Sequence, residues 1–248
     1  MPRKPSDTQH KIAAVYKELV RSARNPGAPI TVTSVVKLAG VDRKTFYNYF
    51  DNIEDLVIWI FRDAVASMLQ DPQFDLAELD YPDRDTQDKY ATLPCYARFR
   101  LSDGMLNQRK FFKALCSTLE ADRDYYHKIF PEPRYQFLYR YMLTLYMPLI
   151  RKDILIIAGE DRQLPTIPLD FLAEYHTMGI FGRVRYHFAM TKKEMSQKEL
   201  QPFWNYAHEV IRITLDAMFE EESHPKDVER SFFKMASKTR LKYTNEFS

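Results

Sequence analysis

The chain has 248 residues, of which 45% are apolar and 14% aromatic, so it can form one large domain or two smaller ones with a substantial core. Its 17 phenylalanines and 16 tyrosines exclude a chain that is disordered throughout, because disordered chains are poor in aromatic residues. The net charge is only +2, and the low count of six glycines leaves few left-handed turns or phosphate-binding loops. The composition therefore predicts an all-α protein.

The charge is unevenly distributed along the chain. Residues 1–50 carry nine basic and three acidic side chains, whereas the rest of the chain carries 27 basic and 31 acidic ones. A basic amino-terminal end on a mildly acidic body is typical of a protein whose first part contacts nucleic acid.

Cysteines and apolar stretches exclude several other classes. Cys95 and Cys116 are too few for a disulfide framework or a zinc cluster, and we expect no metal and no cofactor. The first residues lack the apolar core of a signal peptide, and the most apolar stretch, residues 141–158, is interrupted by Pro148 and by charged side chains. We expect a cytoplasmic protein without a membrane partner.

The first elements in chain order are helices separated by turn signals. Apolar residues recur at helical spacing, Thr31 and Asp42 are expected to cap two short helices, and Gly40 is expected to end the first of these. Asp51 or Asn52 is expected to cap the longer helix that follows. These helices are predicted at residues 7–23, 32–38, 43–49 and 53–70.

The rest of the chain is predicted to form longer helices around one irregular segment. Residues 71–87 are acidic, contain two prolines and show little periodicity, so we expect a loop there. Pro148 is expected to kink one of the later helices. These helices are predicted at residues 89–100, 108–122, 134–158, 169–190 and 200–222.

The two short helices and their turn have the pattern of a helix-turn-helix. Helices of about seven residues are not stable alone, so they must pack on the first helix through their apolar side chains. Phe46 and Phe50 share the buried side of the second short helix, which places Lys44 and Asn48 on the opposite side. Lysine can donate to guanine and asparagine can pair with adenine in the major groove. The alternative is a solvated polar face without a ligand.

This stretch resembles the DNA-binding domain of the TetR/AcrR family of bacterial transcription regulators. The residues that carry the resemblance are Ile30-Thr31-Val32, Ala39-Gly40-Val41, Thr45-Phe46-Tyr47, Tyr49-Phe50 and Glu54-Asp55-Leu56. The resemblance implies an all-α fold with a three-helix DNA-binding head and a larger body that binds a ligand and dimerises. The candidate DNA-binding residues are Thr31, Arg43, Lys44, Thr45, Tyr47, Asn48 and Tyr49.

We accordingly divide the chain into a head (residues 1–52), an effector-binding and dimerisation body (53–223) and a basic tail (224–248). The expected function is that of a homodimeric transcriptional regulator, a repressor that a small-molecule effector releases from a palindromic DNA operator. Signature motifs of common enzyme classes are missing from the sequence, so we do not expect an enzyme.

One residue departs from the family pattern. Where the family usually carries a lysine that meets a DNA phosphate, this chain has Ile53. The loss of a phosphate contact weakens DNA binding. This departure keeps open an alternative, a regulator of the same fold that has lost specific DNA binding and acts through protein–protein contacts.

The last two long helices are expected to pair with those of a second copy as a four-helix bundle. Two glycines allow another backbone to approach closely, and the final helix has a wider apolar face than one body needs. The candidate interface residues are Gly179, Gly182, Phe203, Trp204, Ala207, Ile211 and Leu215. The alternative is that both helices are buried within one chain.

The middle helices are expected to form a ligand pocket. Four tyrosines between residues 135 and 146 supply more hydroxyl groups than a dry core readily satisfies. Arg183 can hold an anionic group and His176 can orient it, whereas His176 and His187 lie about 16 Å apart on a helix, too far to share a metal. The candidate ligand-binding residues are Phe112, Cys116, Tyr139, Met142, Tyr146, Tyr175, His176 and Arg183. Plain core packing is the alternative.

Overall fold

The structure is a computed structural model, and it describes residues 7–25, 28–82, 88–99, 106–159, 166–191 and 210–217. Within these residues the fold is almost entirely helical, which confirms the predicted fold class. Residues 210–217 are also helical. The other α-helices are α1 (Asp7–Ser22), α2 (Val32–Ala39), α3 (Arg43–Tyr47), α4 (Ile53–Met68), α5 (Gln108–Ala121), α6 (Arg123–Ile129), α7 (Gln136–Ala158) and α8 (Thr166–Met190).

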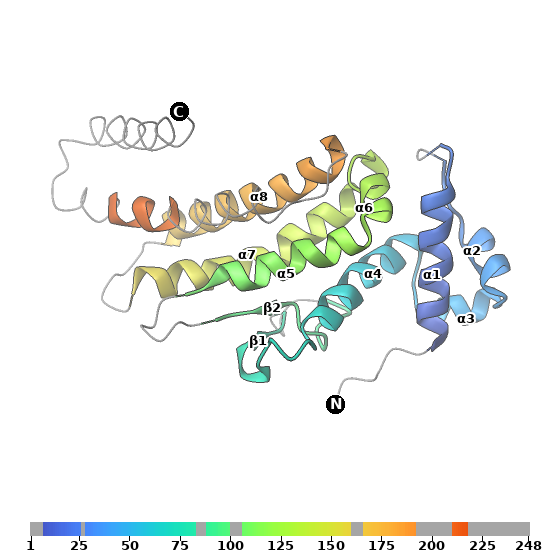
Figure 1. The fold of residues 1–248 in the computed structure, drawn as a ribbon, viewed down its shortest axis with the longest axis horizontal. Helices are drawn as coiled ribbons and strands as arrows, with labels where there is room; N and C mark the ends of the chain where they lie inside the picture. The colour runs from blue at the N-terminus through green and yellow to red at the C-terminus, as the bar shows by residue number, and fades with distance from the viewer. Residues whose placement is uncertain are drawn as a thin grey trace.

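Helices α1 to α3 form a small unit at one end of the molecule (Figure 1). Its core is apolar and fully enclosed, with Tyr16, Val35, Phe46 and Phe50 each 0% exposed. The rings of Phe46 and Phe50 lie 5.5 Å apart, and Phe50 also meets Trp59 of α4 edge-on. These aromatic contacts hold two helices that are too short to be stable alone.

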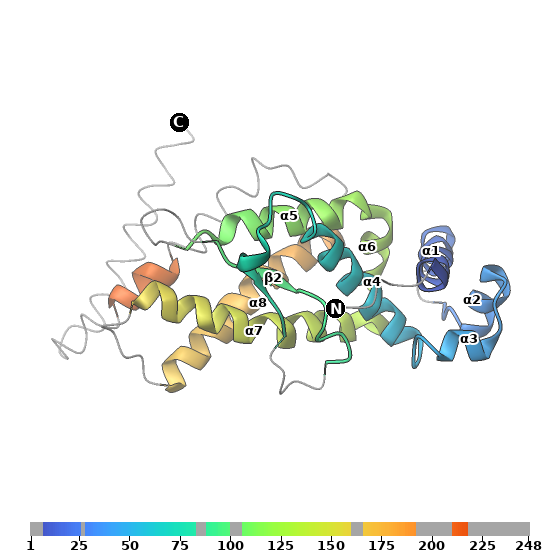
Figure 2. The ribbon, with the colours of Figure 1, turned by 90° about the horizontal axis from the view of Figure 1, so that it is seen from below.

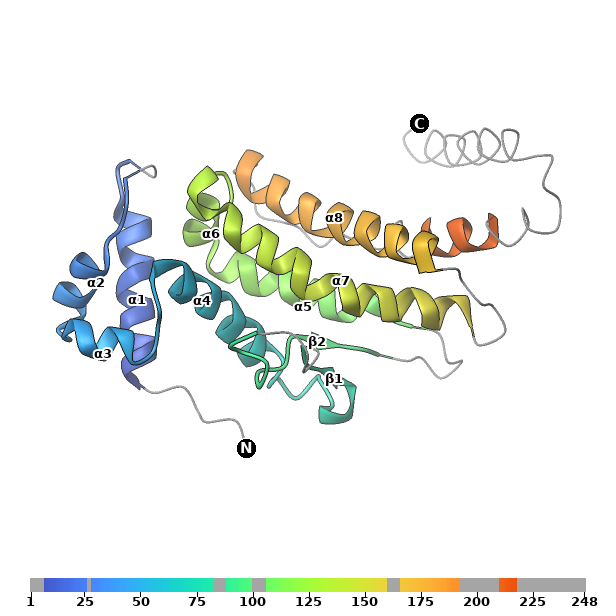
Figure 3. The ribbon, with the colours of Figure 1, turned by 180° about the vertical axis from the view of Figure 1, so that it is seen from behind.

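Helix α4 runs from this unit into the body, where it packs against α5 and α7 (Figure 2). In the body, α7 and α8 lie side by side along most of their length, with α8 on the outer side (Figure 3). The core of the body is aromatic: the rings of Tyr146 on α7 and Phe181 on α8 stack at 4.6 Å, and Tyr96 meets Phe111 of α5 at 4.5 Å.

Residues 71–99 differ from the prediction. The expected loop contains a short 3-10 helix, η1 (Leu76–Glu78), and a strand, β1 (Leu79–Asp80), and the helix expected at 89–100 is wrong. In its place β2 (Tyr96–Ala97) pairs with β1 in an antiparallel ladder, and the flanking Cys95 and Arg98 amides donate to the carbonyl groups of Asp80 and Glu78. Backbone donors that a helix would use internally thus donate to residues 15 to 20 positions earlier in the chain.

The later helices follow the predicted order with two differences. Helix α6 was not expected, and η2 (Pro133–Tyr135) precedes α7. Helix α7 continues through Pro148, so the proline does not end it. Of the helix expected at 200–222, residues 210–217 are described; Phe203, Trp204, Ala207 and the tail at 224–248 lie outside the described residues. No described helix is both long enough and apolar enough to cross a bilayer.

Candidate nucleic-acid interface

The turn between α2 and α3 is built by three local devices, each of which was predicted from the sequence. Thr31 caps α2, because its Oγ1 accepts from the Ser34 amide at 3.2 Å. Gly40 ends α2 with φ +62°, a left-handed conformation that costs a residue with a side chain about 1–2 kcal/mol. Asp42 Oδ1 accepts from the Thr45 amide at 2.6 Å and caps α3. That hydrogen bond lowers the pKa of Asp42 and keeps the cap ionised.

The outward side of α3 carries most of the predicted DNA-binding residues. Arg43, Lys44, Tyr47 and Asn48 are exposed, as is Thr31 at the start of α2. Thr45 and Tyr49 are half-buried at the margins of this face. The buried Phe46 fixes the rotation of α3, so the exposed cations and the amide of Asn48 lie on the side opposite the core. We call the exposed residues Arg43, Lys44, Tyr47 and Asn48 the α3 face.

The start of α4 explains the departure at residue 53. The Ile53 side chain is half-buried and packs on the core, whereas Asn52 is exposed and caps α4 by accepting from the Asp55 amide at 2.9 Å. An apolar residue here anchors α4 instead of reaching outward. Any phosphate contact near this point therefore has to come from another side chain.

The head is held to the body by charged contacts between α1 and α6. Asp122 accepts from Lys17 at 2.8 Å and forms a second ion pair with Arg21. Lys128 of α6 reaches back to the end of α1 and donates to the carbonyl of Ala23, the residue that follows this helix, at 2.9 Å. These contacts place charged groups on both sides of a small head–body junction.

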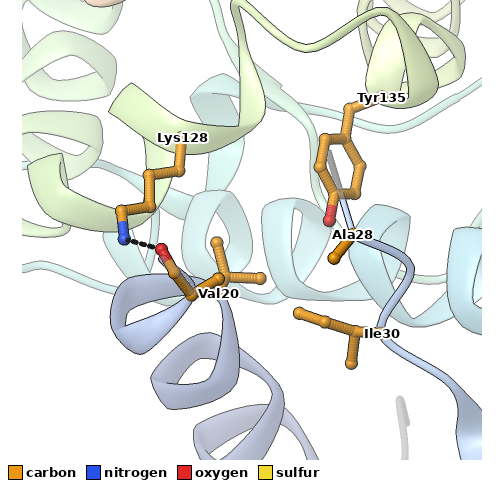
Figure 4. Close-up of a pocket in the computed structure, with 6 residues that line it drawn as sticks. Val20, Ala28, Ile30, Lys128 and Tyr135 are labelled. Atoms are coloured by element: carbon orange, nitrogen blue, oxygen red, sulfur yellow. Dashed lines mark hydrogen bonds between the residues drawn. The ribbon is translucent and has the colours of Figure 1, made fainter. Parts of the chain in front are cut away.

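A hollow lies at this junction and is lined by Val20, Ala23, Ala28, Ile30, Lys128 and Tyr135 (Figure 4). Its volume of about 10 Å³ leaves room for at most one water. It therefore does not serve as the effector pocket expected in the body.

The predicted ligand-binding residues separate into two groups. Phe112, Cys116, Met142 and Tyr146 are each no more than 1% exposed and belong to the body core. Tyr139 is half-buried, and its ring lies 5.1 Å from the Arg185 guanidinium. His176 is buried, its Nε2 has no hydrogen-bond partner within the described part of the chain, and burial lowers its pKa to about 4.

Two members of that set lie elsewhere. Tyr175 is 60% exposed and Arg183 is also exposed on α8, so neither lines a pocket with the buried group. The reason is that α8 buries His176, Thr177 and Ile180 toward the body, which turns Tyr175 and Arg183 to its outer side. The prediction that Arg183 and His176 hold one ligand together is therefore wrong, because the two side chains lie on different sides of α8.

The predicted interface residues are also divided. Gly179 is exposed and open, whereas Gly182 is half-buried and faces the Tyr139 hydroxyl of its own chain, 3.6 Å from where a Cβ would lie. Ile211 and Leu215 are 1% exposed and lie within the core of their own chain, so they do not face a second copy. Here the alternative of burial within one chain holds.

An exposed apolar stripe nevertheless runs along α8. Its members recur at helical spacing on the outer side of the helix and are more than 45% exposed. We call it the α8 stripe, and it consists of Phe171, Tyr175, Met178, Tyr186 and Met190.

Sequence reasoning missed two buried charged residues in the body. Asp153 is fully buried and accepts from the Tyr96 hydroxyl, the Gln108 amide and Arg98 Nε at 2.6–2.7 Å. It therefore ties α7 to α5 and to residues 88–99, which contain β2 and which we call the β2 segment. Arg62 of α4 is also 0% exposed. Its position within the apolar run Ile58–Phe61 and Val65 was a signal that α4 is enclosed on more than one side.

Comparisons with known proteins agree with this architecture. No family model matches the chain. The HTH-type dhaKLM operon transcriptional activator DhaS of Lactococcus lactis subsp. lactis is 41% identical over 64 residues, which is 26% of this chain and 33% of that protein. The chain thus matches about a third of the length of this curated relative.

A solved structure, the dihydroxyacetone kinase operon activator DhaS, aligns with 85% of this chain and 97% of its own, with a TM-score of 0.51 and 21% identity. The chain shares its fold. Both relatives are transcription regulators and not enzymes, in agreement with the expectation that this chain is not an enzyme.

Proposed function

We propose that this chain is a transcription regulator of the TetR/AcrR type that binds DNA through the α3 face. The observation that carries the proposal is the opposition of Lys44 and Asn48, both exposed, to Phe46 and Phe50, both 0% exposed. A helix held this way presents a cation and an amide at a fixed distance from the protein core, as base reading in the major groove requires. The resemblance of residues 30–56 to such regulators supports the same assignment.

We further propose that the regulator is a cytoplasmic homodimer on a palindromic operator. The α8 stripe supports this, because an exposed row of large apolar side chains is a typical protein–protein contact surface. A twofold pairing of α8 would place two heads for half-sites about one helical turn apart or a multiple of it. Met178→Glu, in the middle of the stripe, should then convert the dimer to a monomer in sedimentation velocity, whereas Lys113→Glu on exposed α5 should not.

A small-molecule effector would act by shifting the population of head positions. Support comes from the head–body contacts, because Asp122 links α1 to α6 and α4 continues from the head into the body core. The sequence suggested a repressor, whereas both relatives are named activators. A reporter gene behind the operator, with the regulator present or deleted, distinguishes the two directions.

The central test is duplex binding. We expect the full chain to bind its operator more tightly than a scrambled duplex and to lose affinity steeply between 50 and 200 mM salt. Lys44→Ala and Asn48→Ala should each weaken operator binding by about 5- to 150-fold, the range of about 1–3 kcal/mol for a base contact. Lys113→Ala removes the same charge from an exposed position on α5 and serves as the matched control.

Equal affinity for the operator and the scrambled duplex, unchanged by Lys44→Ala, would refute base reading by the α3 face. It would favour instead the alternative that Ile53 keeps open, a regulator acting through protein contacts. The salt titration separates weak specific binding from this outcome, because only specific binding differs between the two duplexes.

A further inference from the structure

A buried cation with open hydrogen-bonding positions lies in the middle of the body. The guanidinium of Arg62 is 0% exposed, and its Nη2 donates to the backbone carbonyls of Tyr90 and Leu93, each at 2.8 Å. Its Nε and Nη1 are enclosed, and among the described residues no oxygen or nitrogen acceptor reaches them; the Cys95 thiol is a weak side-chain partner of the guanidinium. No carboxylate among the described residues lies within ion-pair distance of this guanidinium.

A second unpartnered donor belongs to the same neighbourhood. The Tyr146 hydroxyl of α7 is fully buried and makes no hydrogen bond to any residue that the structure describes. The positive charge of Arg62 acts on the pKa of Tyr146 and on that of Tyr141, opposing the upward shift that burial causes. It also opposes burial at the Cys95 thiol, whose pKa is nevertheless raised to about 11. The charge of Arg62 on α4 thus acts on polar groups contributed by the residues around β2 and by α7.

A buried guanidinium with unsatisfied donors costs free energy unless a further group supplies the missing acceptors. A buried charge requires a counter-charge or a full set of hydrogen bonds, and a guanidinium offers five donors. The acceptors that fit two parallel donors of an arginine are the oxygens of a carboxylate or a phosphate. The Tyr146 hydroxyl can donate to the same anion.

We propose that Arg62 anchors a small-molecule site in the body and that the ligand presents an oxyanion, a carboxylate or a phosphate, to Arg62 and Tyr146. The inference rests on the proposed function, since it assigns a chemical class to the effector of that regulator.

The same guanidinium is linked to the start of α4 through one short segment. The Tyr90 carbonyl accepts from Arg62, while the Tyr90 hydroxyl donates to Asp55 Oδ1 at 2.6 Å. The neighbouring Lys89 pairs with Asp55 at 2.5 Å and with Asp51 at 3.1 Å. Asp51 directly follows Phe50, which ends the packing of α3 on the core. A ligand that draws Arg62 away from the Tyr90 carbonyl would thus loosen the contact that fixes α4 behind the α3 face.

The binding test uses the full chain without DNA. Inorganic phosphate and acetate are titrated separately by calorimetry at constant ionic strength, with sodium chloride and neutral acetamide as reference solutes. We expect one of the two anions to bind wild type and to raise its melting temperature, and which one does so distinguishes phosphate from carboxylate recognition. Arg62→Met should weaken that binding at least tenfold, about 1.4 kcal/mol. Arg140→Met, which changes an exposed side chain of α7, should leave it unchanged.

Tyr146→Phe is the second variant, because a loss of anion binding in this variant cannot be attributed to misfolding. The hydroxyl it removes has no partner to lose, so the protein should fold as wild type does and bind the anion several-fold more weakly. Anion binding that is absent from wild type, or equal in wild type and Arg62→Met, would overturn the proposal. Binding of acetamide as tight as that of acetate would overturn the assignment of an anion.

Operator binding, measured separately, distinguishes this inference from the proposed function. If wild type binds the anion through Arg62 but does not bind the operator, only the DNA-binding role is refuted. Normal operator binding without any anion binding would refute only the site. If both hold, the anion should change operator affinity in wild type and leave that of Arg62→Met unchanged.

Discussion

The buried imidazole of His176 makes stability depend on pH in a way that can be calculated. Burial lowers its pKa from 6.5 to about 4, so the folded protein holds this ring neutral at a pH where the unfolded chain protonates it. Stability from this group is therefore complete above pH 6.5 and is lost as the pH falls toward 4. Linkage gives a loss of about 2 kcal/mol between pH 7 and pH 5, and about 3 kcal/mol once the folded ring also titrates.

His176→Phe keeps a ring in the core and removes the titration. We expect urea unfolding at one fixed protein concentration to show that wild type loses about 2 kcal/mol more than this variant between pH 7 and pH 5. Carboxylates contribute equally to both proteins and cancel in the difference. Tyr175→Phe, on the exposed neighbour, should follow wild type. An equal pH dependence of wild type and His176→Phe would refute the burial of a neutral imidazole at this position.

Three further predictions concern the head and its attachment. Gly40→Ala should lower the free energy of unfolding by about 1–2 kcal/mol, measured by urea denaturation, because its φ of +62° strains any side chain. Asp122→Asn removes the acceptor charge shared by two α1 cations and should cost about 1–3 kcal/mol, whereas Asp124→Asn, exposed on α6, should cost little. Lys89→Met should cost less than about 1 kcal/mol of stability, because the pair is partly exposed. It should also weaken duplex binding in a fluorescence titration, because two aspartates next to the DNA-binding unit lose their counter-charge.

The head could be predicted from the sequence because its determinants are local. The caps at Thr31 and Asp42, the left-handed Gly40 and the pair Phe46 and Phe50 all act within about 20 residues of chain. Each is a residue type with one strong conformational preference at that position. Their agreement with one another is what made the outward side of α3 predictable.

The β2 segment could not be predicted in the same way. Residues 89–100 contain apolar side chains at spacings that fit a helix, and only Pro94 argued against one. What decides the conformation is the pairing of Tyr96 with Asp80, 16 residues earlier, which depends on the path of the chain between the two strands and not on a preference of either residue. Short strands formed by such pairing leave no periodic pattern to read.

Helix α8 shows a second limit of sequence patterns. It is apolar around most of its circumference, so periodicity does not indicate which side faces the body. Contact with α7 and α6 buries Ile180, Val184 and Phe188, the last against the rings of Tyr126 and Phe130, and this leaves Tyr175 and Arg183 outside. Its neighbours decide which side of such a helix is buried. For this reason the predicted ligand-binding residues and the predicted interface residues each include some that are buried and some that are exposed.

Asp153 and Arg62 are both charged and both buried in the body, but they differ in how completely their hydrogen bonds are satisfied. Asp153 is 0% exposed and receives three hydrogen bonds from groups on α5 and the β2 segment, so its charge is fully paired within the chain. Arg62 is equally buried, yet among the described residues two of its nitrogens and the Tyr146 hydroxyl have no oxygen or nitrogen partner. Replacing a buried ion by an apolar residue of similar volume is often neutral or stabilising, so the two hydrogen bonds from Arg62 to backbone carbonyls do not by themselves account for a buried charge. A role in binding supplies the missing reason, because an oxyanion would provide for Arg62 what the surrounding side chains provide for Asp153.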